Sequence, residues 1–137
     1  MGLPVNSEIN LFGKHKKGKK NLITDIEGVR VGHSTIKKDN INTGVTVIFP
    51  HEGNIFQEKV MAASAVLNGF GKSVGLLQIE ELGTIETPIV MTNTLSVGTA
   101  TTALIKYMLK QNEDIGIDTG TVNCLVTECN DGRLKMF

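Results

Sequence analysis

Residues 88–111 read PIVMTNTLSVGTATTALIKYMLKQ, and this stretch decides how the chain folds. A short apolar run follows Pro88, and a proline is tolerated at the first position of a strand. Ser96 is a suitable N-cap for a helix. Four apolar residues then recur at helical spacing: Val97, Ala100, Leu104 and Met108. The stretch predicts a strand at 88–92 and a helix from Ser96 to about Gln111.

The segments on either side of this stretch have strand patterns. A run at 29–36 alternates in polarity, and a β-branched run at 44–49 ends at Pro50. The short polar link between them predicts a hairpin. On the other side, a glycine-containing loop leads to a predicted strand at 121–127, and residues 128–132 carry a turn signal.

Two further segments lie between the hairpin and the decisive stretch. Apolar residues at helical spacing predict a helix at 57–68, whereas the short apolar run 74–79 predicts a strand. The stripe on the predicted helix consists of Val60, Ala63, Leu67 and Phe70. The predicted order is strands, helix, strands, helix, strand, which is typical of an α+β domain with helices laid on a sheet.

Composition indicates one globular domain. The chain has 137 residues, of which 40% are hydrophobic and 20% charged, and its formal net charge is zero. This balance gives no bulk attraction to nucleic acid or anionic lipid. The basic run Lys14–Lys20 could bind anions, but we expect residues 1–20 to be a solvated, mobile lead-in to a domain at 21–137.

The two cysteines and the absence of long apolar runs bear on the cellular compartment. Cys124 and Cys129 lie five residues apart on an extended segment, so their side chains point to opposite faces and are poorly placed for a disulfide. Two buried, reduced thiols are the simpler expectation. No apolar run approaches the ~20 residues that span a bilayer. We therefore expect a cytoplasmic protein without a membrane partner.

The residues alone reveal no complete catalytic set. His15, His33 and His51 lack the spacing of metal ligands, so no metal site is expected. The segment 68–73 faintly resembles a phosphate loop, but it lacks the first glycine and would close a helix rather than open one. Glu80 and Glu81 are adjacent and point apart in helix or strand, which excludes a ready acid/base pair.

Several sequence motifs, taken together, point to a family that the single residues do not reveal. In their order along residues 21–132 they resemble the DmpA-type L-aminopeptidase/D-esterase family of self-processing N-terminal-serine hydrolases. The motifs are NLITDIEGVRVGH at 21–33, TGVTVI at 43–48, NGFGK at 68–72, EELGTIETPIVMTNTLSVG at 80–98, TVN at 121–123 and ECNDG at 128–132.

The resemblance implies a four-layer αββα sandwich and an aminopeptidase that hydrolyses amides or esters of N-terminal amino acids. Such enzymes cut themselves before a serine, whose freed α-amine can act as the local base. No metal or organic cofactor is implied. The last serine of this sequence is Ser96, and residues 133–137 diverge from the family's usual continuation. We therefore expect the nucleophile and the β-subunit to be missing, and the isolated chain to be inactive.

The resemblance also suggests where this chain contributes to the site. Asn130 aligns with a position that could donate to the oxyanion, although it could equally be only a turn residue. Asn93 and Thr94 could line the substrate pocket, or they could serve only as helix-entry caps. The glycines near Gly69 and Gly98 are interpreted as close packing.

A second hypothesis is a non-catalytic remnant that acts as a binding or assembly module. In either case we expect a complementary C-terminal half or β-subunit as partner, or self-association into a homo-oligomer. The apolar face between Val29 and Phe49 would otherwise remain uncovered, and free strand edges pair with other chains.

Overall fold

The main sheet has four strands in the order β1-β2-β5-β6 in a computed structural model that describes residues 15–130. β1 (Arg30–Lys38) and β2 (Ile41–Phe49) form an antiparallel hairpin. β5 (Ile89–Asn93) pairs antiparallel to β2 and parallel to β6 (Leu125–Cys129). The predicted hairpin and the predicted strand before Ser96 are confirmed.

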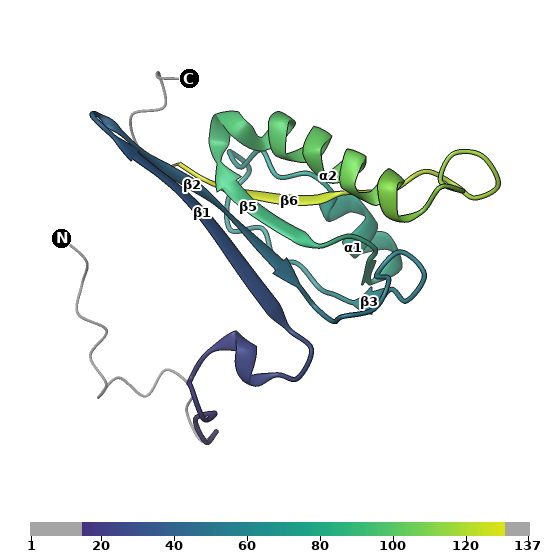
Figure 1. The fold of residues 1–137 in the computed structure, drawn as a ribbon, viewed down its shortest axis with the longest axis horizontal. Coiled ribbons are helices and arrows are strands. Elements are labelled where there is room, and N and C mark those ends of the chain that lie inside the picture. Colours follow the sequence, from purple (N-terminus) through teal and green to yellow (C-terminus); the bar gives the residue numbers. More distant parts are fainter. Residues whose placement is uncertain (1–14, 131–137) are drawn as a thin grey trace.

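Helix α2 (Val97–Gln111) makes the crossover between the parallel strands β5 and β6 and lies along one face of the sheet (Figure 1). A parallel pair cannot be joined by a tight turn, so a crossover of this kind is required. Val97, Leu104 and Met108 are buried on the helix, and Met108 and Val126 of β6 are almost completely excluded from solvent. The predicted helix is confirmed with its apolar stripe.

The start of α2 is capped differently from the expectation. The Ser96 side chain makes no capping hydrogen bond. A 3-10 turn, η2 (Thr94–Ser96), precedes the helix, and the Asn93 Oδ1 atom accepts a hydrogen bond from the Ser96 backbone N–H at 2.9 Å. The cap residue of the helix entry is therefore Asn93.

A buried polar cluster fixes the segment that leads into β6. The Glu86 carboxylate accepts a hydrogen bond from the Asn123 backbone N–H at 2.8 Å and pairs with the Lys59 ammonium at 2.8 Å. The Thr87 Oγ1 atom accepts from the Leu125 backbone N–H at 3.0 Å. Both carboxylate oxygens are thus satisfied, as a buried charge requires.

The predicted helix at 57–68 is wrong. Residues 60–61 form strand β3 (Val60–Met61), which pairs with β4 (Thr84–Ile85) in a small second sheet. The Ala62 backbone N–H donates to the Gly83 carbonyl at 2.8 Å. This hydrogen bond joins two segments that are distant in the sequence, whereas in a helix the same N–H would donate to a carbonyl four residues earlier. Leu67 and Phe70, expected on the buried stripe, are 97% and 81% exposed.

The predicted strand at 74–79 is also wrong. The segment forms helix α1 (Leu76–Leu82), with Ile79 buried, and only Val74 makes a bridge, to Val126 of β6. A short apolar run has no period long enough to separate strand from helix. Here Gly83 ends the helix in the left-handed conformation at φ 64°, which a glycine adopts without strain.

The fold class, α+β, is confirmed, with smaller differences near the C-terminal end. The last strand begins at Leu125 instead of residue 121. Cys124 is buried and Cys129 exposed, so the expectation of two buried thiols is wrong for Cys129. The predicted turn at 128–132 lies partly outside the described residues. Within residues 15–130, no helix is long and apolar enough to cross a membrane.

We expect Gly75→Ala to lower the free energy of unfolding by about 2 kcal/mol or more. Gly75 has φ 91°, and an added Cβ would lie 2.3 Å from the Cys124 carbonyl oxygen. Gly98→Ala is the matched control, because nothing lies within 4 Å of its Cβ position and alanine favours helix by up to about 1 kcal/mol. Urea unfolding measures both, and equal stability of the two variants would contradict the prediction.

Candidate functional site

The carboxyl ends of β5 and β6 lie side by side. The two strands are parallel, and their register places Asn93 beside Cys129. The residues that follow, Thr94 and Asn130, therefore reach the same edge of the sheet, although 36 positions separate them in the sequence. This edge carries the polar side chains from which the candidate site is built.

Glu128 is the central group at this edge. Its carboxylate accepts a hydrogen bond from the Lys72 backbone N–H at 3.2 Å through Oε1. The Thr94 hydroxyl donates to its other oxygen, Oε2. The side chain is half-buried and is held from two sides, by the β5 end and by the loop before α1. Such a carboxylate is positioned and negatively charged, yet it still faces an open space.

That space is a pocket of about 700 Å³ between the loop 64–73 and the ends of β5 and β6. Its polar wall includes Thr94, Glu128 and Asn130, with the exposed Cys129 beside them. The loop supplies much of the opposite wall, including the exposed apolar side chains Leu67 and Phe70. The pocket can therefore hold a ligand that has both an ammonium or hydrogen-bonding end and an apolar part.

The loop 64–73 keeps its shape through local hydrogen bonds. The Asn68 Oδ1 atom accepts from the Phe70 backbone N–H at 3.1 Å. The Lys72 ammonium donates to the Phe70 carbonyl and lies over the Phe70 ring. Since Lys72 also donates its backbone N–H to Glu128, this loop is tied to the carboxylate that it faces.

The structure separates the sequence-predicted site residues into two sets. Thr94 and Asn130 both line the pocket. Asn93 is buried behind them: its Oδ1 atom accepts from the Ser96 backbone N–H, and its Nδ2 atom donates to the Thr43 hydroxyl at 2.8 Å. Asn93 thus holds the turn that presents Thr94.

Glu128 lines the pocket but is not among the candidate residues that the sequence indicates. The sequence places it only in a turn signal, because its neighbours in space, Thr94 and Lys72, are far away in the sequence. A carboxylate at the end of a predicted strand was the available signal. Among the described residues, no cluster of three or more His, Cys, Asp or Glu side chains could hold a metal ion.

By fold, the chain is an α+β domain with a polar pocket at the carboxyl ends of the parallel strands β5 and β6. It belongs to Peptidase family S58, whose model matches residues 21–136. The resemblance to DmpA-type aminopeptidases is thereby confirmed.

Known proteins support this membership. The chain is 30% identical over 129 residues, 88% of its length, to the beta-peptidyl aminopeptidase BapA of Sphingosinicella microcystinivorans. It covers 22% and 31% of the lengths of the two BapA proteins that it matches, so it corresponds to less than a third of those chains.

Solved structures share the fold. The PH0078 protein from Pyrococcus horikoshii OT3 is 58% identical with a TM-score of 0.82, and the match covers 85% of this chain and 35% of that one. The L-aminopeptidase D-Ala-esterase/amidase from Ochrobactrum anthropi is 31% identical with a TM-score of 0.74 and the same two coverages. The latter is described as a prototype for the serine aminopeptidases and a variant of the Ntn hydrolase fold.

The two thiols should differ in reactivity. Burial, with the charge of Glu86 adding to it, raises the pKa of the Cys124 thiol from its ordinary 9.0 to about 11, so this thiol stays protonated at pH 8. We expect a disulfide reagent at pH 8 to modify only Cys129 in the native protein and both cysteines in denaturant. Cys129→Ser should leave no thiol that reacts in the native state. Rapid labelling of Cys124 without denaturant would contradict its burial.

Proposed function

We propose that this chain forms one wall of the active site of an aminopeptidase that hydrolyses amides or esters of N-terminal amino acids. The observation that carries the proposal is the placement of Glu128, Thr94 and Asn130 in one pocket at the carboxyl ends of β5 and β6. Membership in a peptidase family with aminopeptidase relatives supports the same reaction class.

The nucleophile is assigned to polypeptide outside this sequence, as a serine freed by self-cleavage. Ser64 and Ser73 line the pocket, but none of the lining residues is a histidine that could activate them. His33 and His51 are engaged elsewhere, with the Thr46 hydroxyl and the Glu58 carbonyl. A serine at a new chain terminus would bring its own α-amine as base, which would remove the need for a histidine.

Glu128 is assigned to the free amino group of the substrate. An enzyme that acts on N-terminal residues must distinguish an ammonium from an acylated amine, and a positioned carboxylate does this through a charge-assisted hydrogen bond. The Thr94 hydroxyl and the Lys72 backbone N–H orient the two carboxylate oxygens. The exposed apolar side chains of the loop 64–73 would then contact the side chain of the substrate.

Asn130 is assigned to the oxyanion. It is exposed, it lines the pocket, and its amide can donate to the negative charge that develops on the carbonyl oxygen during acyl transfer. Asn93 is assigned no contact with the substrate and instead positions Thr94 by fixing the turn on which Thr94 lies.

The first test is complementation. We expect the isolated chain to release no p-nitroaniline from amino-acid p-nitroanilides, and turnover to appear when a complementary polypeptide is added. The part of the Pyrococcus horikoshii protein that this chain does not cover is a practical source of it. Asn130→Ala should then lower kcat by about 100-fold or more and change KM less, because an oxyanion contact forms mainly in the transition state. An unchanged kcat would reduce Asn130 to a turn residue.

The second test concerns the carboxylate. In the complemented enzyme we expect Glu128→Gln to raise KM for substrates with a free amine by about 10- to 100-fold, since a hydrogen bond to a charged group is lost. Glu81→Gln, on the exposed surface of α1, is the matched control and should change nothing. If the Glu128 variant discriminates against N-acetylated substrates as strongly as the parent does, the Glu128 carboxylate does not recognise the free amino group of the substrate.

A further inference from the structure

The sequence contains a single Asn-Gly pair, Asn68–Gly69, and this pair lies in the loop 64–73 that lines the polar pocket. An asparagine loses its side-chain amide when the backbone nitrogen of the next residue attacks the side-chain carbonyl carbon. A side chain on that next residue obstructs the attack, whereas glycine has none and lets the backbone approach closely. Asn68 and Gly69 are both exposed, so water has access to the pair.

The structure holds Asn68 in a geometry that assists this attack. Its Oδ1 atom accepts a hydrogen bond from the Phe70 backbone N–H at 3.1 Å. Negative charge develops on Oδ1 when the carbonyl carbon is attacked, and a positioned N–H donor stabilises such a charge. Within residues 15–130, the Gly69 N–H donates no hydrogen bond, and nothing lies within 4 Å of the position that a Gly69 Cβ would take. The attacking nitrogen is therefore free and unobstructed.

Asn54 provides a comparison within the same chain, because it makes the same turn without a glycine. Its Oδ1 atom accepts from the Phe56 backbone N–H at 3.1 Å, but the next residue is Ile55, which is β-branched and buried. The Asn54 Nδ2 atom also donates to the Asn112 Oδ1 atom at 2.7 Å, which holds the amide that would have to leave. Asn54 and Asn68 thus share the stabilising donor and differ in access to the attacking nitrogen.

We propose that Asn68 is a site of spontaneous deamidation that changes the pocket wall facing Glu128. The Gly69 nitrogen bonds to the Asn68 Cγ atom, the bond between Cγ and Nδ2 breaks, and ammonia leaves with the proton of the Gly69 N–H. Water then opens the cyclic imide at either carbonyl and leaves aspartate or isoaspartate. The net reaction consumes water and releases ammonia, without a change of oxidation state.

Either product alters the surroundings of Glu128. Both products add a carboxylate to the pocket, and like charges that lie close together repel each other. Isoaspartate also lengthens the main chain by one carbon, about 1.5 Å, and so displaces Lys72, whose backbone N–H orients the Glu128 carboxylate. The effect on substrate recognition rests on the proposed function of Glu128, whereas the deamidation itself does not.

The chain by itself tests the modification. After incubation at pH 8, peptide mass mapping measures conversion at Asn68 and at Asn54 in the same digest. We expect the Asn68 peptide to gain the mass difference between an amide and an acid, and the Asn54 peptide to stay unchanged. Gly69→Ile reproduces the Asn54–Ile55 pair and should slow conversion at Asn68 by about 10-fold or more, because a β-branched side chain restricts the attack. Circular dichroism checks that the variant is folded.

Two results would overturn the assignment of Asn68. One is conversion at Asn68 that is no faster than at Asn54, or that occurs only after unfolding in urea. The other is conversion in a folded Gly69→Ile variant that is as fast as in the parent.

The complemented enzyme tests the consequence for Glu128. We expect turnover by the incubated parent to fall in step with the converted fraction, since a displacement of about 1 Å in a site can cost about 100-fold in rate. Gly69→Ile, incubated in the same way, should retain the turnover that it had beforehand. Full turnover by a completely converted parent would contradict the effect on Glu128. Absence of turnover in the fresh complex, with Asn68 still converting, would instead contradict the proposed function and leave the modification site standing.

Discussion

The parallel pairing of β5 and β6 is the constraint on which the rest of the structure depends. Parallel strands cannot be joined by a tight turn, so the chain must leave the sheet after Asn93 and return as α2 before it can pair again. The same geometry brings both carboxyl ends to one edge. Thr94 and Glu128 can therefore share a hydrogen bond across 34 positions of sequence, and the helix that makes the crossover also contributes Val97, Leu104 and Met108 to the core.

The buried polar cluster at Glu86 and Thr87 fixes the register in which β6 pairs with β5. Both residues accept hydrogen bonds from backbone N–H groups of the segment that enters β6, at Asn123 and Leu125. A slip of that segment by one residue would leave a buried carboxylate or hydroxyl without its donor, at a cost of about 1–3 kcal/mol for each group. The register that places Glu128 at the pocket is thus held from the opposite end of the strand by polar groups, while Val126 and Met108 supply the apolar burial.

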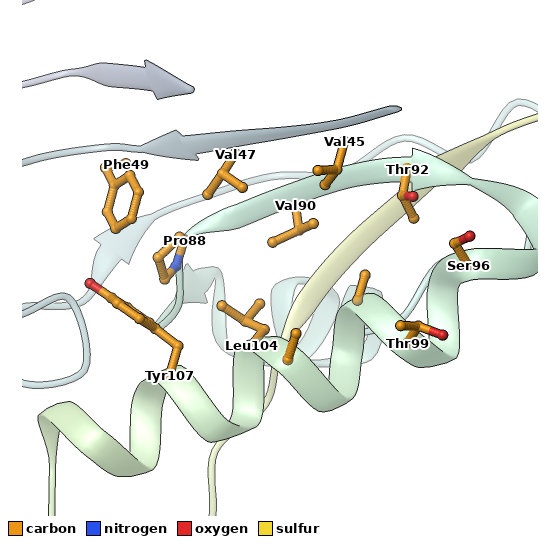
Figure 2. A pocket seen from close by; sticks show the side chains of 12 residues that line it. Val45, Val47, Phe49, Pro88, Val90, Thr92, Ser96, Thr99, Leu104 and Tyr107 are labelled. Carbon is orange, nitrogen blue, oxygen red and sulfur yellow. The ribbon is translucent and has the colours of Figure 1, made fainter. Parts of the chain in front are cut away.

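The different polarity of the two hollows in this domain, a polar pocket and an apolar groove, follows from the same topology. The polar pocket lies where strands end, because backbone turns and strand-end side chains gather there. A second hollow, an apolar groove of about 450 Å³, lies between α2 and the middle of the sheet, where β2 presents alternate apolar side chains to the α2 face (Figure 2).

The sequence by itself determined the long, strongly patterned elements. The hairpin, the strand β5 and the helix α2 have hydrophobic patterns long enough to identify them. The matched sequence motifs identified the family. It also indicated Thr94 and Asn130, which the structure brings into one pocket. The segment 57–82 was decided by tertiary structure, because Val60 and Met61 pair with residues 84–85 and because Gly75 and Gly83 delimit a helix too short to show a period. The place of Glu128 in the pocket was decided in the same way, since Thr94 and Lys72 contact it only once β5 and β6 have paired.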